Sequence, residues 1–162
     1  VPASHLMGGE NEGMRIMLGG VNMDRITWPL IAHAASTRAF EETVSFTKNR
    51  KGFGQTIFDF QNTQFKLAEI ETDLTVGRTL MNDMIRRYRA GTFTERDGSM
   101  VKLWITDMEG RVLDTCVQLW GGSGWMDDHP IARMYTAARV TRIFVGSNEL
   151  QKHMIARRYV RG

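Results

Sequence analysis

The sequence predicts an all-α protein, built as an up-down four-helix bundle with one short additional helix. Three observations support this prediction. The 162 residues include only 3 prolines, apolar residues recur at intervals of three and four over long segments, and glycine-containing stretches at 51–54, 90–91 and 121–124 separate those segments. Short connections make consecutive helices antiparallel neighbours. We therefore expect three long antiparallel helices and a fourth helix that is broken.

The first helix is expected over about residues 11–47. Pro29 lies inside this span and has no backbone N–H, so we expect a kink there, at a cost of about 3 kcal/mol if nothing compensates. Residues 1–10 contain Pro2 and a pair of glycines, and are expected to form a linker or the end of a strand rather than a helix. The apolar residues that the first helix carries are Met17, Val21, Ile31, Ala35 and Phe46.

The clearest helical pattern covers residues 65–88. Its apolar residues step alternately by three and four positions, which places them on one side of a long helix. Gly77 belongs to this row and predicts the close approach of a neighbouring helix. The members of the row are Leu67, Ile70, Leu74, Gly77, Met81, Met84 and Tyr88.

A third long helix is expected from about Thr94 to Trp120. Thr94 and Asp97 have the spacing of a capping box, in which two side chains satisfy the free N–H groups at a helix start. A short helix should follow Pro130, and a last helix should follow Ser147, which is a good N-cap. The apolar row of the third helix consists of Val101, Trp104, Met108, Val112, Cys116 and Leu119.

Composition excludes several classes of protein. The net charge is only +3, no run of 18 apolar residues could span a membrane, and the histidines have no metal-ligand spacing, so we expect no metal. Cys116 is the one cysteine, which favours a buried thiol and a reducing cytoplasm. Arg157, Arg158 and Arg161 complement the dipole at the end of a helix. The alternative, a nucleic-acid patch, is less favoured, and we expect no nucleic-acid partner.

Several segments carry a known family pattern. Residues 118–126 read QLWGGSGWM and residues 139–149 read RVTRIFVGSNE. Residues 49–57 (NRKGFGQTI) and 60–68 (FQNTQFKLA) match the pattern QRxxFGxxIxxFQxxQxxLA, with Asn49 in place of the usual glutamine. In this order and at these separations, the segments resemble the flavin-dependent acyl-CoA dehydrogenases, and the resemblance covers nearly the whole chain.

The resemblance implies a domain organisation. In that family a subunit has a helical N-terminal domain, a β-domain and a C-terminal helical bundle, and subunits form dimers or tetramers through their bundles. Residues 1–10 correspond to the end of the β-domain or a linker, and residues 11–162 to the C-terminal bundle. The chain begins at Val1 without an initiator methionine, and is expected to be a piece of a longer protein.

The resemblance also implies contacts with the cofactor FAD. Arg50 and Phe53 contact its diphosphate and adenosine portion, with Gln61 nearby, because a guanidinium offers a planar fork of donors to phosphate. Ser147 and Glu149 lie against the cofactor near its reacting end. Without the resemblance, the glycines of residues 121–124 would be only an interhelix loop, Phe53 only a core anchor and Gln61 only a surface residue. The residues implied to contact the same nucleotide from a neighbouring subunit are Gln118, Gly121 and Gly122.

One position departs from the family. Where this chain has Val145, most members have the glutamate that removes the α-proton of the substrate, and valine cannot accept a proton. Long-chain and isovaleryl-type members instead carry their glutamate on the first long helix, immediately before an arginine, and here that dipeptide is Asp24-Arg25. Asp24 is then the base and Arg25 orients it or the substrate; otherwise the two form only a surface or structural ion pair. Two further explanations compete with this one: Glu149 is the base, or the protein has lost dehydrogenation.

The function that the resemblance implies is the oxidation of an acyl-CoA, or an acyl group on a carrier protein, to its α,β-unsaturated thioester. FAD is the cofactor and an electron-transfer flavoprotein takes the electrons. The chain alone is expected to be inactive and to self-associate through apolar surface that other domains or subunits cover. The alternative is a catalytically degenerate helical module that serves oligomerisation or flavin binding.

Overall fold

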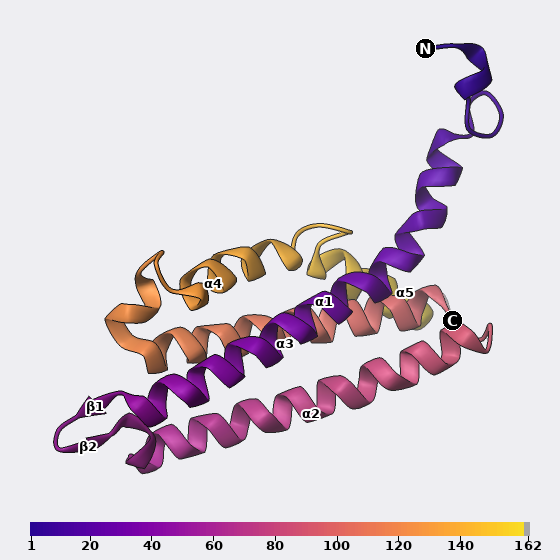
Figure 1. Cartoon of the computed structure of the whole chain (residues 1–162). Helices are drawn as coiled ribbons and strands as arrows, with labels where there is room; N and C mark the ends of the chain where they lie inside the picture. Colours follow the sequence, from indigo (N-terminus) through magenta and orange to yellow (C-terminus); the bar gives the residue numbers. More distant parts are fainter. Residues whose placement is uncertain (161–162) are drawn as a thin grey trace.

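The computed structural model describes residues 1–160, so the predicted role of Arg161 lies outside the described residues. The chain is helical almost throughout (Figure 1). The elements in order are η1 (Ala3–His5), α1 (Gly13–Asn49), β1 (Lys51–Gly52), β2 (Gln55–Thr56), η2 (Ile57–Asp59), α2 (Gln61–Arg89), α3 (Glu95–Trp120), η3 (Gly121–Trp125), α4 (Pro130–Thr141) and α5 (Asn148–Val160).

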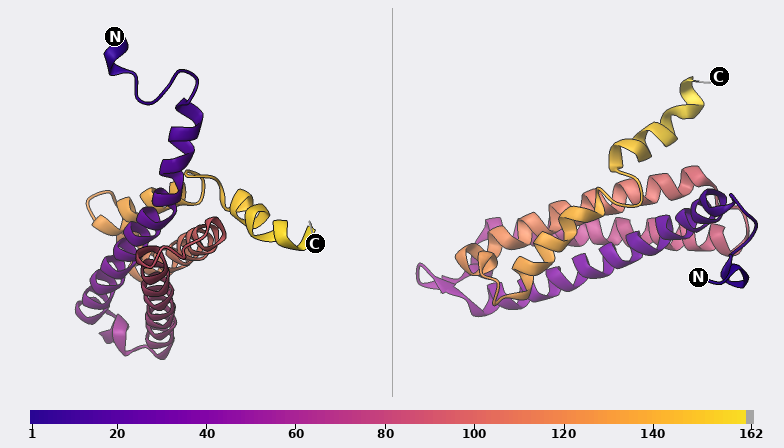
Figure 2. Two further views of the ribbon diagram at one scale, coloured as in Figure 1. Left: turned by 90° about the vertical axis from the view of Figure 1, so that its right-hand side faces the viewer. Right: turned by 90° about the horizontal axis from the view of Figure 1, so that it is seen from above.

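The three long helices α1, α2 and α3 lie side by side, and α4 runs back along α3 (Figures 1 and 2). The first turns of α1 extend beyond the bundle, and α5 points away from it (Figure 2). α1 passes through Pro29 as one continuous helix. The predicted all-α, up-down bundle is thus confirmed, with α4 and α5 as the broken fourth helix.

Two short segments differ from expectation. Residues 51–54, expected only to separate two helices, belong to an antiparallel hairpin that pairs Lys51 with Thr56 and Gly52 with Gln55. The two residues at its tip, Phe53 and Gly54, have φ angles of +54° and +83°, as a two-residue turn of this kind requires. Among residues 1–12 the structure has one 3-10 turn, Ala3–His5, and no strand.

The apolar rows predicted for α2 and α3 are confirmed. Every member of the α2 row is buried except Tyr88, which lies at the end of the helix and is exposed. In α3, Trp104 and Leu119 are half-buried and the other members of the row are buried. The capping box is also present, because the Asp97 N–H donates to Thr94 Oγ1 at 3.2 Å and the Thr94 N–H donates to Asp97 Oδ2 at 2.9 Å.

The apolar residues expected to mark α1 do not define its buried face. Met17 and Ile31 are exposed. The hydroxyls of Ser36, Thr43 and Thr47, all fully buried, donate to the carbonyl four residues earlier at 2.7 to 2.9 Å. These internal hydrogen bonds remove the cost of burying a hydroxyl, and the small side chains let α3 approach closely. The buried face consists of Arg25, Ile26, Pro29, Ala32, Ser36, Ala39, Thr43 and Thr47.

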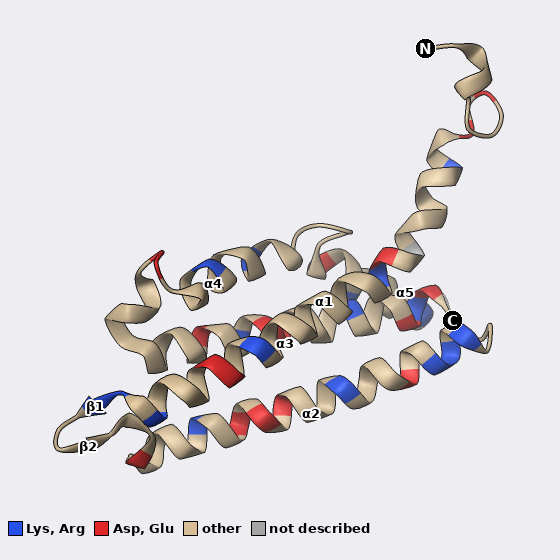
Figure 3. Ribbon diagram, in the orientation of Figure 1, with Lys and Arg blue, Asp and Glu red and all other residues tan. Residues whose placement is uncertain are grey.

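Charged residues of both signs are mixed along the helices, whereas the projecting start of α1 has almost no charged residues (Figure 3). Arg15 is the one charged residue between Gly13 and Met23. Four apolar side chains in this span, those of Met14, Met17, Leu18 and Met23, are exposed. Within residues 1–160 no helix is long and apolar enough to cross a membrane.

The close approach predicted at Gly77 supplies a test of the packing. A Cβ there would lie 3.0 Å from His33 and 3.2 Å from both Trp104 and Ile105, so we expect Gly77→Ala to lower the free energy of unfolding by about 1–3 kcal/mol. Gly20→Ala is the matched control, because a Cβ at Gly20 meets no atom within 4 Å. That change should raise the free energy by about 0.5–1 kcal/mol, since alanine favours a helix. Chemical unfolding of both variants measures this, and a stabilised Gly77→Ala protein would contradict the packing.

Candidate active site

The predicted site residues fall into two groups at opposite ends of the bundle. Near the hairpin, the indole N–H of Trp120 donates to Thr43 Oγ1 at 3.1 Å, which joins the ends of α3 and α1. The turn between α4 and α5 lies instead near the start of α3, where Lys102 contacts Asn148. Lys102 and Gly121 are about 28 Å apart along α3 at 1.5 Å per residue. We call the two regions the hairpin end (residues 50–61 and 118–125) and the turn end (residues 24–28, 95–107 and 142–151).

The hairpin end presents an exposed cation, an exposed aromatic ring and open glycines. The carbonyl of Arg50 accepts the Ile57 N–H at 2.8 Å, which closes the hairpin and leaves the Arg50 side chain exposed. Phe53, at the hairpin tip, is 98% exposed. A Cβ at Gly121 or Gly122 would meet no atom within 4 Å, so a ligand could approach the backbone there. The other predicted residues at this end, both exposed, are Gln61 and Gln118.

The turn end contains a strained backbone. Val145 has a φ of +56° and is followed by Gly146 with a φ of +83°. A left-handed conformation is unfavourable for a β-branched residue, because its Cβ crowds the carbonyl. The turn is closed by the Asn148 N–H, which donates to the Arg142 carbonyl at 3.0 Å. Ser147 Oγ accepts the Leu150 N–H at 3.4 Å, and so caps α5 as predicted.

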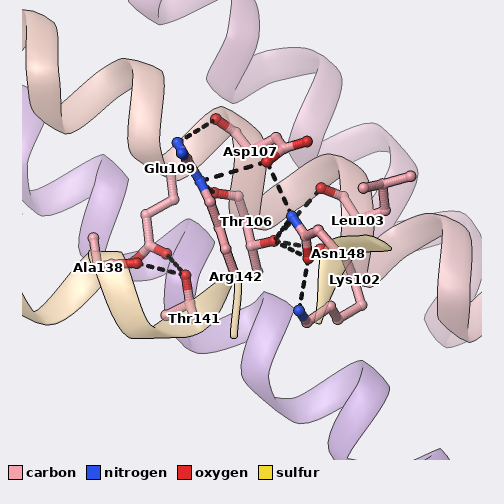
Figure 4. A network of polar contacts seen from close by, with 9 residues as sticks. All are labelled: Lys102, Leu103, Thr106, Asp107, Glu109, Ala138, Thr141, Arg142 and Asn148. Carbon is pink, nitrogen blue, oxygen red and sulfur yellow. Dashed lines mark hydrogen bonds and ion pairs between the residues drawn. The ribbon is translucent and has the colours of Figure 1, made fainter. Parts of the chain in front are cut away.

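A buried polar network fixes the start of α5 on α3 (Figure 4). Lys102 is fully buried, and its Nζ donates to Asn148 Oδ1 at 2.6 Å. The amide of Asn148 donates to Thr106 Oγ1 at 3.0 Å and to Asp107 Oδ1 at 2.9 Å. Burial lowers the pKa of Lys102 to about 8, while Asp107 and Glu149 act in the opposite direction. No sequence pattern had pointed to Lys102 or Asn148.

Arg25 lies at the turn end, where its charge adds to the lowering of the pKa of Lys102, and Asp24 precedes it on α1. The ring of Trp28, one turn after Asp24 on α1, packs edge-on against Phe144 with centroids 4.4 Å apart. Phe144 precedes Val145, so the face of α1 that carries Asp24 meets the turn that carries Val145. Arg25 is 6% exposed and its guanidinium donates to Glu95 at 3.2 Å, so it holds α1 against the start of α3. Asp24 is half-buried.

Glu149, the other carboxylate near Val145, has a lowered pKa, whereas a base for this reaction requires a raised one. Its side chain is exposed. Hydrogen bonds from its own backbone N–H and from Ser147 lower the pKa of its carboxyl group. A general base for an α-proton works best with a pKa raised towards neutrality. The geometry at the start of α5 therefore makes Glu149 a weak base.

Two further buried groups lie on α3. Burial raises the pKa of the Cys116 thiol to about 11, so the thiol is un-ionised at neutral pH and unsuited to nucleophilic chemistry. Burial also raises the pKa of Glu109, which accepts a hydrogen bond from Thr141 Oγ1 at 2.7 Å. Glu109 was not selected from the sequence. Within residues 1–160 no three histidine, cysteine or acidic side chains gather in a way that could hold a metal ion.

Comparison with known proteins identifies the family. A sequence model described as "Acyl-CoA dehydrogenase, C-terminal domain" matches residues 11–160. The chain belongs to the acyl-CoA dehydrogenase family. It is 38% identical over 160 residues to the long-chain specific acyl-CoA dehydrogenase, mitochondrial, of Sus scrofa, a match that covers 99% of this chain and 37% of that protein.

Solved structures superpose on nearly the whole chain. The acyl-CoA dehydrogenase of Geobacillus kaustophilus superposes with a TM-score of 0.92 at 36% identity, over 98% of this chain and 42% of that chain. A structure described as PigA with FAD and proline superposes with a TM-score of 0.89 at 25% identity, over 100% of this chain and 43% of that chain. The present chain thus spans about two-fifths of the length of these relatives.

The strain at Val145 gives a stability prediction for this member of the family. Glycine adopts a positive φ without penalty, so Val145→Gly should raise the free energy of unfolding by about 1 kcal/mol. Val140→Gly is the control, because Val140 lies inside α4 and is also partly exposed. That change should lower the free energy by a similar amount. Thermal unfolding of the two variants compares them, and destabilisation by both changes would show that Val145 is not strained.

The buried Lys102 predicts a pH dependence of stability. Its folded pKa of about 8 lies below the 10.5 of an unperturbed lysine. Between these pH values the unfolded chain binds more protons than the folded one, so the free energy of unfolding rises with pH. Lys102→Met should abolish this rise, which is on the order of 2–3 kcal/mol. Urea unfolding between pH 7 and 10 measures it, with the partly exposed Lys66→Met as control; equal pH dependence in all three proteins would refute the prediction.

Proposed function

We propose that the whole protein is an FAD-dependent dehydrogenase that converts an acyl thioester to its α,β-unsaturated form, with Asp24 as the base. The observation that carries this proposal is the packing of Trp28 against Phe144, whose ring centroids are 4.4 Å apart. It joins the α1 face that bears Asp24 to the turn where most family members carry their glutamate. A base could therefore move from the turn to α1 and still act in the same corner of the molecule.

The roles of Asp24 and Arg25 follow from their surroundings. Asp24 removes the α-proton, and its half-buried position leaves it accessible while limiting hydration. Aspartate is one methylene shorter than glutamate, and a misplacement of about 1 Å can cost on the order of a hundredfold in rate. Arg25, buried and paired with Glu95, fixes α1 so that this short side chain keeps its position. FAD, when bound, accepts the hydride that leaves the β-carbon.

The hairpin end fits the nucleotide part of FAD. Arg50 supplies an exposed guanidinium for the diphosphate, and the ring of Phe53 is 98% exposed, so it is free to pack against a ligand. The open backbone at Gly121 and Gly122 permits close approach of phosphate oxygens. Gln61 and Gln118 supply amides beside them. At the turn end, Ser147 and Glu149 are proposed to contact the reacting part of the cofactor.

The separation of the two ends supports assembly from more than one copy. About 28 Å along α3 divides Gly121 from Lys102, so we propose that the hairpin end of one copy and the turn end of another serve one nucleotide. This proposal differs from the expectation that Gln118, Gly121 and Gly122 belong to a different subunit than Arg50 and Phe53, because both groups lie at the hairpin end of one chain. A homodimer or homotetramer formed through the bundle would achieve this. Exposed apolar side chains are available for such contacts. A groove of about 740 Å³ between α3 and α4 is lined by Leu113, Trp125, Tyr135, Val140 and Ile143 among others.

The remaining partners belong to the same proposal. The thioester is carried by coenzyme A or by a carrier protein, and an electron-transfer flavoprotein accepts the electrons. In the whole protein, the helical N-terminal domain and the β-domain would contribute to the flavin and acyl pockets. This chain alone should therefore not reduce flavin with any acyl-CoA. The buried thiol of Cys116 suits a reducing cytoplasm, whereas the Sus scrofa relative carries "mitochondrial" in its name.

The decisive experiment compares the full-length protein with its Asp24→Asn variant. Acyl-CoA thioesters of several lengths are added without oxygen, and the bleaching of bound flavin is followed. We expect Asp24→Asn to lower the rate of bleaching by about 10²–10⁴-fold at equal flavin content, because a general base contributes this much. Glu71→Gln, which changes an exposed acid on α2 far from both ends of the bundle, is the control and should bleach normally.

Two other outcomes would overturn parts of the proposal. Normal bleaching of Asp24→Asn would leave a dehydrogenase whose base is another group. A wild-type protein that binds flavin but is not bleached by any thioester would support the alternative, a helical oligomerisation or flavin-binding module that has lost the reaction.

A further inference from the structure

The backbone at Val145 and Gly146 requires something to hold it. Both residues have the left-handed backbone conformation, with φ angles of +56° and +83°. This conformation is unfavourable for valine, so the backbone would relax out of it if nothing held it there. The carbonyl groups of both residues point towards α5 rather than into a helix. What binds those carbonyls therefore decides whether the turn keeps its shape.

One side chain binds both of them. Nε2 of Gln151 donates to the Gly146 carbonyl at 2.9 Å and to the Val145 carbonyl at 3.2 Å. Gln151 is fully buried. It fills the space beneath the turn so closely that a Cβ on Gly146 would lie 2.8 Å from Nε2. The fit depends on glycine at 146 and on glutamine at 151.

Gln151 is itself fixed by the network around Lys102. Its N–H donates to the Ser147 carbonyl at 3.0 Å, within the first turn of α5. That turn begins at Asn148, whose side chain is held by Lys102 Nζ at 2.6 Å and by Asp107 Oδ1 at 2.9 Å (Figure 4). α3 therefore positions α5, and α5 delivers Gln151 to the turn.

We propose that Gln151 is a positioning residue, which holds the Val145–Gly146 turn in its left-handed form against the face of α1 that carries Asp24. The inference rests on the proposed function, because the turn and Asp24 together form the reacting corner. Lys102 acts on the position of Gln151 indirectly, because it anchors Asn148 at the start of α5.

A purely structural role for Gln151 explains the contacts less well. Its Oε1 is buried and has no hydrogen-bond partner among the described residues. An unpaired buried acceptor is unfavourable, and methionine, of similar size, would avoid it. The amide nitrogen is what the site uses, and both of its bonds go to the strained residues.

The test uses the full-length flavoprotein and three variants. Gln151→Met removes the amide, Val145→Gly/Gln151→Met also removes the strain, and Ser36→Ala is the control. Ser36 is also buried, but its hydroxyl donates to the Ala32 carbonyl within α1 and does not touch the turn. Amide hydrogen exchange is measured over residues 143–151, where the Asn148 N–H reports closure of the turn. Flavin content, kcat and KM are measured on the same proteins.

We expect Gln151→Met to speed exchange over residues 143–151 by about tenfold or more and to lower kcat by about 10–100-fold. KM should change by less than about threefold and flavin content should be unchanged, because the binding of substrate and flavin does not use the two hydrogen bonds of Gln151. Val145→Gly should restore most of kcat in the double variant, since glycine holds a positive φ unaided. A residue with only a structural role would show no such rescue, because the two effects would add.

Unchanged exchange in Gln151→Met, or a double variant as slow as the single one, would overturn the proposal. If Gln151→Met does not fold, Lys102→Met decides the matter, because Lys102 anchors Asn148 at the start of α5. Faster exchange of the same amides supports the role proposed for Gln151, and unchanged exchange refutes it. If the wild-type protein oxidises no thioester, the proposed function fails. Exchange and its reversal by Val145→Gly then still decide whether Gln151 holds the turn.

Discussion

The burial of α3 is the constraint on which the rest of the structure depends. α1, α2, α4 and α5 all pack on this helix, so its polar groups must find partners inside the protein. Lys102 finds Asn148, and Glu109 finds Thr141. Each pair ties α3 to the segment that leads into or out of the Val145 turn. The polar contacts of the core thus place the turn, while apolar packing supplies most of the stability.

Two arginines from other segments lie against α3 where it has glycine. Arg25 packs over Gly98, where an added Cβ would lie 3.2 Å from the arginine Cβ. The guanidinium of Arg142 occupies the space that a side chain at Gly110 would need. It thereby approaches the Thr106 carbonyl at 3.3 Å. The sequence cost of this arrangement is glycine inside a helix, which is unfavourable by about 1 kcal/mol relative to alanine.

The sequence predicted those parts of the fold whose buried faces are apolar. The rows of α2 and α3 were found because leucine, methionine and valine mark the core by hydropathy. The face of α1 was not, because Ser36, Thr43 and Thr47 satisfy their hydroxyls within the helix and look polar in the sequence. The hairpin was hidden because its left-handed tip residue is a phenylalanine. Resemblance selected Asp24 and the proposed cofactor residues, but nothing local marks Lys102 or Gln151, whose partners are distant or depend on backbone shape.

Under the proposed function, the contact between Trp28 and Phe144 explains how the reaction survives without a carboxylate on the turn. The turn and α1 meet at this contact, so a base on α1 would face the substrate atom that a base on the turn faces in other family members, with no change in the scaffold. Valine at the vacated position keeps that corner apolar but leaves a strained backbone, which glycine would not. The strain is tolerated because the surrounding bonds over-determine the turn: Asn148 closes it and Gln151 holds both its left-handed carbonyls. A strained turn held in this way keeps one conformation, and a side chain as short as that of Asp24, the proposed base, depends on such fixed surroundings.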